Sequence, residues 1–145
     1  SYVTVHSSGG IDMLKAAVDG LNEGATAAGL TPPMVLGVSV LTSEKSATPE
    51  KLQERISNVV AADCGGIVCA ASDLLLVTEQ APELLSVVPG IRPEGVSNND
   101  QGRPATPSTA IQEGAGLLVI GRADTASADL EQAANAIALE VSDAL

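Results

Sequence analysis

The sequence predicts an α/β domain built on a parallel sheet, and two observations lead to this prediction. Five short runs rich in Val, Leu and Ile alternate along the chain with five segments that have helical spacing of apolar residues or helix-capping signals. The connections between them are short, which is typical of parallel strands joined by right-handed helical crossovers. At 145 residues and 45% hydrophobic content, the chain is expected to form a single domain over residues 1–145.

The five predicted strands are short apolar runs bounded by turn residues. They are Tyr2 to His6, Val35 to Leu41, Gly66 to Ala70, Leu85 to Val88 and Leu117 to Ile120. The second is apolar on both faces apart from Ser39, as expected for a sheet covered by helices on both sides. Five strand and helix units do not close an eight-stranded barrel. The first and last strands would therefore be open edges, which proteins cover by pairing or association.

Helices are predicted between the strands from apolar spacing and from end signals. Thr48 and Thr106 each precede a proline, which is typical of a capping residue before the first helical position. Gly24 and the loop Gly29 to Pro33 are expected to end the first helix, and Ser127 to cap the last. The expected buried faces are Ile11, Leu14, Val18 and Leu21 in the first helix, Leu52, Ile56, Val59 and Val60 in the second, and Leu130, Ala134, Ile137 and Val141 in the last.

Arginines follow the last two strands, each within two residues of a glycine: Arg92 and Arg122. The chain has seven Lys and Arg against 18 Asp and Glu, and beyond Arg55 its only cations are Arg92, Arg103 and Arg122. In parallel α/β folds ligands bind at the carboxyl ends of strands, and arginine binds phosphate with two parallel hydrogen bonds. These strand ends are therefore a predicted anion site. The alternative is that each arginine pairs with a surface carboxylate.

Composition also limits the partners and the compartment. A net charge of −11 disfavours nucleic acid and anionic membranes as partners. No secretory signal is apparent, and no apolar run approaches the ~18 residues of a membrane span, so a soluble cytoplasmic protein is expected. Cys64 and Cys69 have neither a metal-binding nor a redox spacing, and both are expected to be free thiols. No metal and no cofactor is predicted.

Several motifs, in order along essentially the whole chain, resemble one enzyme family. They are Val3 to His6 with Ser8 to Gly10, Val38 to Ser43, Gly66 to Cys69, Val88 to Pro93, Asp100 and Gln101 before Arg103, Ala105 to Pro107, and Val119 to Arg122. The family is that of the orotidine 5′-phosphate decarboxylases. The resemblance is to the C-terminal part, strands four to eight of a (β/α)8 TIM barrel, and it implies an incomplete barrel of about five βα units.

The resemblance implies a ligand site for a phosphorylated pyrimidine nucleotide, orotidine monophosphate (OMP) or UMP. By its motifs Arg92, Gln101, Gly121 and Arg122 would hold the phosphate, with Gln101 on a loop that closes over it. Thr42 would contact the nucleoside, although a threonine at that place could equally cap a turn. The implied reaction converts OMP to UMP and CO2, a step of pyrimidine biosynthesis, without metal or organic cofactor.

No catalytic residue is assigned from the sequence. The family uses a lysine between aspartates, in a motif of the form Asp-x-Lys-x-x-Asp, and the lysines here are Lys15, Lys45 and Lys51. None of the three is predicted at a strand end between two aspartates, so the catalytic half of the site is interpreted as missing. His6 closes the first strand and could act as a general acid or base, but a lone histidine without a carboxylate partner is also typical of a structural residue.

Three hypotheses about function remain open. In the first, the chain is the C-terminal piece of a decarboxylase, whose activity needs an N-terminal half. In the second, it binds UMP or a similar nucleotide without catalysis, through its arginines. In the third, it is a half-barrel that associates with itself as a homo-oligomer. The retained phosphate motif favours the first two hypotheses, and the open strand edges favour the third.

Overall fold

The sheet has five parallel strands that pair in chain order. The structure, a computed structural model, describes residues 1–41, 48–93 and 102–145. The strands are β1 (Tyr2–His6), β2 (Met34–Val38), β3 (Gly66–Val68), β4 (Leu85–Val88) and β5 (Leu117–Leu118). Every neighbouring pair is parallel. The predicted α/β class with a parallel sheet is confirmed, and β1 and β5 are its edges.

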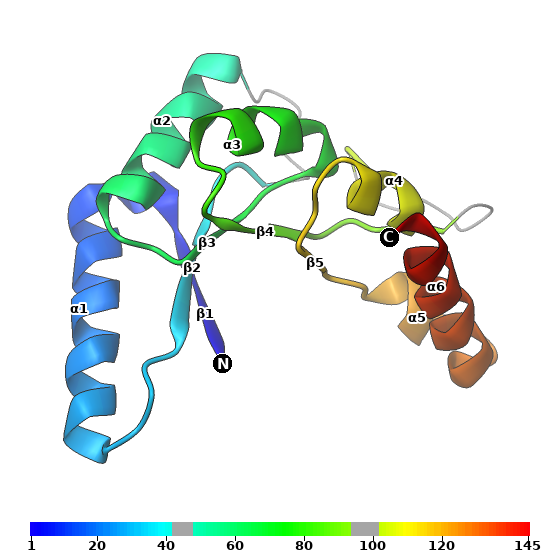
Figure 1. The fold of residues 1–145 in the computed structure, drawn as a ribbon, viewed down its shortest axis with the longest axis horizontal. Helices are drawn as coiled ribbons and strands as arrows, with labels where there is room; N and C mark the ends of the chain where they lie inside the picture. The colour runs from blue at the N-terminus through cyan, green and yellow to red at the C-terminus, as the bar shows by residue number, and fades with distance from the viewer. Residues whose placement is uncertain (42–47, 94–101) are drawn as a thin grey trace.

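Helices follow the strands around one side of the sheet, so that they form an arch with the strands on its inner side (Figure 1). Two 3-10 turns, η1 (Ser7–Gly9) and η2 (Ala71–Asp73), follow β1 and β3. The α-helices in the described residues are α1 (Ile11–Ala28), α2 (Pro49–Ala61), α3 (Leu74–Gln80), α4 (Pro107–Gln112), α5 (Arg122–Thr125) and α6 (Leu130–Ala144). None of these helices has the length and apolarity needed to cross a membrane.

The hydrophobic core lies between the sheet and these helices. Val35, Ile67 and Val88 stand on neighbouring strands and pack in one cluster with Leu14 of α1 and Ile56 of α2. Because side chains alternate along a strand, these residues share one face of the sheet. The expectation of helices on both faces is therefore wrong, since the described helices cover one face as they do in a barrel.

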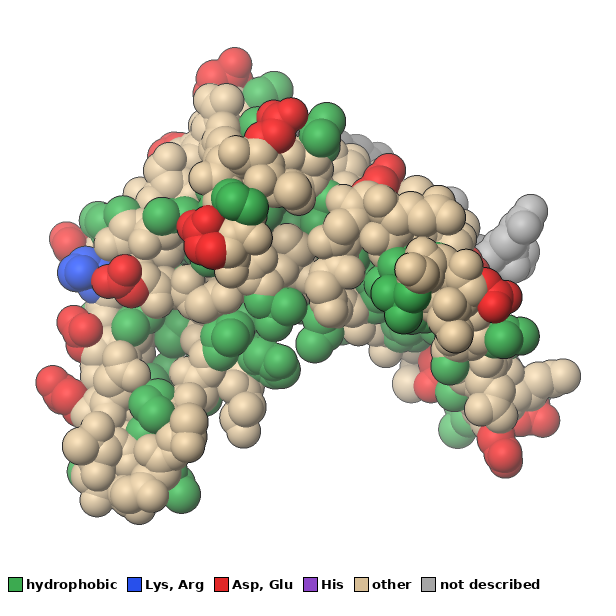
Figure 2. Space-filling model, viewed as in Figure 1, with side chains coloured by type: hydrophobic (Ala, Val, Ile, Leu, Met, Phe, Trp, Pro, Cys, Tyr) green, Lys and Arg blue, Asp and Glu red, His purple; other side chains and the backbone are tan. Residues whose placement is uncertain are grey.

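The inner face of the sheet is also apolar, and part of it is open. Leu36 and Val87 are buried there by their neighbours, whereas Tyr2 and Met34, which pair in register at the β1 edge, are 53% and 38% exposed. Figure 2 shows hydrophobic side chains along the inner side of the arch. The predicted open edge at β1 is confirmed by these exposed side chains.

The predicted caps of α2 and α4 are confirmed. The Thr48 hydroxyl accepts a hydrogen bond from the Lys51 amide, and the Thr106 hydroxyl accepts one from the Thr109 amide. In both helices proline follows the cap as the first helical residue. Two local signals in the sequence, a hydroxyl residue and the proline after it, therefore locate these helix starts.

Of the other predicted helix ends, Gly29 is confirmed as the end of the first helix, whereas Gly24 and Ser127 are wrong. Helix α1 runs through Gly24 and ends at Ala28, because Gly29 adopts the left-handed conformation (φ 66°) that closes a helix. Asp129, not Ser127, caps α6, since its carboxylate accepts from the Gln132 amide at 2.9 Å. Leu130 on α6 is 55% exposed, so it is not part of a buried face.

The strand predictions err mainly at the carboxyl ends. The second, third and fifth strands end two to three residues earlier than expected, at Val38, Val68 and Leu118. Parallel pairing stops at these residues because the chain leaves the sheet there and enters the loop that follows each strand. The short helix α5 was not predicted, and it brings the described α-helices to six rather than five.

Burial of Cys69 at the end of β3 leads to a prediction about alkaline stability. Burial, reinforced by the charge of Asp73 and opposed by Arg103, raises the pKa of this thiol to about 12 from an ordinary value of 9.0. Between these values the unfolded chain loses the proton and the folded chain keeps it. The free energy of unfolding should therefore fall as pH rises from 9 to 12, by up to about 1.4 kcal/mol per pH unit from this group.

The measurement is denaturant unfolding at several pH values for the chain and for Cys69→Ala. The variant should lose the Cys69 share of the slope, while every other group is the same in the two proteins. Equal slopes above pH 9 in the two proteins would contradict the assignment.

Candidate functional site

The carboxyl ends of all five strands lie along one edge of the sheet, because every pair is parallel. This carboxyl edge runs across the strands and is distinct from the edge strands β1 and β5. The β4–β5 register pairs Val88 with Leu118. Arg92 comes four residues after Val88, and Arg122 four residues after Leu118. The two arginines therefore follow adjacent parallel strands at the carboxyl ends of the sheet. This is the edge at which parallel α/β proteins bind ligands.

Arg92 is held by the backbone around it. Gly90 supplies a positive φ of 80°, which turns the chain after β4. Ile91 then forms a parallel bridge with Ala105, and the Arg92 amide donates to the Ala105 carbonyl at 2.8 Å. The guanidinium Nη1 donates to the Ile91 carbonyl at 2.7 Å, and only 6% of the residue is exposed. Arg92 thus places a positive charge just below the surface of this edge.

Arg122 begins the short helix α5 and is exposed. The amides of Asp124 and Thr125 both donate to the Gly121 carbonyl, at 2.9 and 3.0 Å, which closes the turn of α5. Arg122 therefore lies at the start of this turn, directly after Gly121. A Cβ placed on Gly121 would meet nothing within 4 Å. The space beside Gly121 therefore allows a ligand to approach the backbone.

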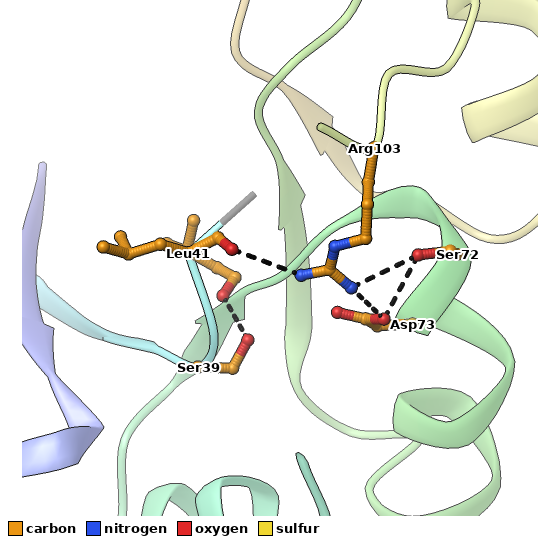
Figure 3. A network of polar contacts seen from close by, with 6 residues as sticks. Ser39, Leu41, Ser72, Asp73 and Arg103 are labelled. Atoms are coloured by element: carbon orange, nitrogen blue, oxygen red, sulfur yellow. Dashed lines mark hydrogen bonds and ion pairs between the residues drawn. The ribbon is translucent and has the colours of Figure 1, made fainter. Parts of the chain in front are cut away.

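A third arginine, Arg103, forms a polar network at the same edge (Figure 3). Its Nη1 pairs with the Asp73 carboxylate at 2.5 Å and lies 3.3 Å from the Ser72 hydroxyl. Its Nη2 donates to the Leu41 carbonyl at 3.4 Å. Ser72 also donates to Asp73 at 3.2 Å. This network joins the segments that follow β2, β3 and β4.

Asp73 is the residue at this edge that the sequence analysis missed. It is 8% exposed and lies in η2, directly after β3, within the stretch predicted only as a short helix and connection. The sequence does contain one indication of this residue, because Asp73 is a carboxylate that follows a buried strand. The partner Arg103 is 30 residues away in the sequence, so spacing could not join the two.

The other predicted site residues fall in two groups. Thr42 and Gln101 lie outside the described residues, as does Lys45. His6 is exposed at the end of β1, and among the described residues it has no ion pair and no side-chain hydrogen bond. The adjoining turn is instead fixed by Ser7, whose hydroxyl donates to the Val38 carbonyl at 2.7 Å. Ser7, and not His6, therefore anchors the turn that follows β1.

The described lysines lie away from the strand ends. Lys15 is on α1, and Lys51 is in the first turn of α2. Neither occupies a strand end between two aspartates. Among residues 1–41, 48–93 and 102–145, no cluster of three His, Cys, Asp or Glu side chains could hold a metal ion. The edge thus presents arginine rather than lysine side chains, at Arg92, Arg103 and Arg122.

Comparison with known proteins gives consistent matches. The family model described as "Orotidine 5'-phosphate decarboxylase / HUMPS family" matches residues 1–137. Orotidine 5′-phosphate decarboxylase from Lactiplantibacillus plantarum is 37% identical over 99% of this chain, and the enzyme from Paramagnetospirillum magneticum is 40% identical over 97%. The crystal structure of orotidine 5′-phosphate decarboxylase from Lactobacillus acidophilus superposes with a TM-score of 0.74 at 31% identity and covers 97% of the chain.

The matches cover only part of each relative. The chain spans 65% of the length of the two relatives from L. plantarum and P. magneticum and 63% of the L. acidophilus structure. The five described βα units thus correspond to part of a larger fold.

The different burial of the two arginines predicts different effects on stability. Arg92→Ala removes a buried guanidinium that bonds the backbone, and it should lower the free energy of unfolding by about 2 kcal/mol. Arg122→Ala removes an exposed side chain and should change it by less than about 1 kcal/mol. Urea unfolding followed by circular dichroism measures both values. Equal losses in the two variants would contradict the burial of Arg92 in the site.

Proposed function

Because the chain belongs to the orotidine 5′-phosphate decarboxylase / HUMPS family, we propose that it binds the phosphate of a pyrimidine nucleotide, OMP or UMP, at the carboxyl edge of its sheet. Its five-stranded sheet is an incomplete (β/α)8 barrel of that family. The proposed ligands of the phosphate are Arg92, Gly121 and Arg122, with Gln101. Thr42 is proposed to contact the nucleoside.

The position of Arg92 and Arg122 just after two adjacent parallel strands is the observation that carries this proposal. The carboxyl ends of these strands lie at the same edge of the sheet, and the open space beside Gly121 lies next to Arg122. Phosphate has several oxygen acceptors for guanidinium and amide donors. With a net charge of −11, the chain as a whole repels anions, so binding depends on this local group of cations.

Arg92 and Arg122 are proposed to have different roles. Arg122 is exposed and starts α5, so its guanidinium and the neighbouring amides would contact phosphate directly. Arg92 is 6% exposed and bonded to Ile91, so its main contribution is a fixed positive charge and a fixed loop. A preorganised charge needs little rearrangement when the ligand arrives.

Decarboxylation would need more than these residues. The family resemblance implies a lysine between aspartates that stabilises the carbanion at C6 of the pyrimidine. Neither Lys15 nor Lys51 is placed for this role, because both are on helices. We therefore assign to this chain the binding of the nucleotide phosphate, and we propose that turnover to UMP and CO2 in pyrimidine biosynthesis requires the lysine and aspartates from elsewhere. The two free cysteines agree with a cytoplasmic location.

Replacement of Arg122 tests the proposed site. Arg122→Ala should weaken UMP binding by at least about a hundredfold, since it removes a charged hydrogen-bonding partner of the phosphate. Isothermal titration calorimetry at low salt measures the dissociation constant. Lys15→Ala is the matched control, because it removes an exposed cation from α1, and it should bind UMP as the unchanged chain does.

A loss of UMP binding in Arg122→Ala must also be distinguished from a loss of folding. Circular dichroism should be the same for Arg122→Ala and the unchanged chain. Equal affinity of the two proteins for UMP, or no binding by the unchanged chain, would overturn the phosphate assignment.

Association of two copies is a second candidate function, and the open β1 edge favours it. Tyr2 and Val3 on this edge are 53% and 37% exposed, next to an apolar inner face. Tyr2→Lys should shift the sedimentation of the chain from dimer to monomer. Leu75→Lys, which changes an exposed leucine on α3, is the control and should leave the dimer intact. A monomer for the unchanged chain would contradict this candidate.

A further inference from the structure

Residues 102–105 are bonded to the rest of the fold at two points, through the backbone of Ala105 and the side chain of Arg103. On one side Ala105 forms the bridge with Ile91 and accepts a hydrogen bond from the Arg92 amide. On the other side Arg103 reaches Asp73 in η2 and the Leu41 carbonyl beyond β2. The segment therefore connects the buried Arg92 to the loops that leave β2 and β3.

The ion pair in this connection is well shielded from solvent but incompletely bonded. The Arg103 and Asp73 side chains are 20% and 10% exposed. Among the described residues Asp73 Oδ2 and Arg103 Nε are buried and have no hydrogen-bond partner. A shielded ion pair with unpaired polar atoms is a poor source of stability compared with apolar packing. Its position between the segments that follow β2, β3 and β4 therefore points to a role in holding geometry.

We propose that Asp73 and Arg103 are positioning residues, whose ion pair fixes residues 102–105 and through them holds Arg92 in place for phosphate. This inference rests on the proposed function and adds to it a partner that touches no ligand. The Ser72 hydroxyl and the Leu41 carbonyl are neutral acceptors at 3.3 and 3.4 Å, so the strongest anchor of Arg103 is the Asp73 carboxylate. Asp73 supplies that anchor because it lies in η2, directly before α3.

Local hydrogen exchange tests the positioning step independently of ligand. In Asp73→Asn the carboxylate charge is lost at nearly constant shape, so residues 102–105 should detach more often. The Arg92 amide, which bonds to Ala105, should then exchange at least about tenfold faster by NMR. The Cys69 amide, which bonds to the Val87 carbonyl at 3.1 Å within the sheet, is the internal reference and should keep its rate.

Two results would overturn the positioning step. One is an unchanged rate at Arg92. The other is an equal acceleration at Arg92 and Cys69, because it would mean general destabilisation. Glu54→Gln is the matched control: it removes the same single charge from an exposed carboxylate that pairs with Arg55, and it should leave both amides unchanged.

UMP titration tests the consequence for the ligand. Asp73→Asn should weaken UMP binding about tenfold through the displaced Arg92, while Asp73→Glu, which keeps the charge, should recover most of the affinity. Full affinity in Asp73→Asn would overturn the inference and leave the proposed function standing. No UMP binding by the unchanged chain would overturn the proposed function and the ligand part of this inference, and the exchange rates would still decide whether the ion pair fixes the segment.

Discussion

Parallel pairing of five strands in chain order is the constraint on which the rest of the structure depends. It forces each connection to return along the sheet, and the described helices do so on one face, where Val35, Ile67 and Val88 form the core. It also brings the carboxyl end of every strand to one edge, where Arg92 and Arg122 follow adjacent strands. A slip of one residue between two strands would turn their core side chains to the opposite face, so packing and site geometry are fixed together.

Those parts of the fold that depend on local signals could be predicted from the sequence. The strands are apolar runs, and Thr48 and Thr106 are capping residues followed by proline, so both are visible within a few residues. The start of the last helix was not, because Ser127 and Asp129 are both good caps, and packing decides between them. Helix α5 has too few residues to show a period. Coverage of one face rather than both is a property of the whole sheet, which no single strand reveals.

The candidate site, like the fold, could be predicted from the sequence only in part. Arg92 and Arg122 could be singled out because each follows a strand and a glycine in an acidic chain with few cations. Their different environments could not be foreseen: Arg92 is buried against its own backbone, and Arg122 is exposed. The pair of Asp73 and Arg103 arises only when the exits of β3 and β4 meet in space. The arginines at this edge thus differ in environment: Arg122 is exposed, Arg92 is buried against backbone, and Arg103 is paired with a carboxylate.

Phosphate is proposed to bind where β4 and β5 leave the sheet, and an NMR titration of the labelled chain examines this position residue by residue. UMP and uridine, which lacks the phosphate, would be added in parallel while backbone amide shifts are followed. If phosphate binds there, UMP will move the amides of Gly121, Arg122 and Ala123, with a smaller change at Arg92, and uridine will leave the first three in place. Equal shifts with uridine, or UMP shifts confined to β1 and α1, would contradict it.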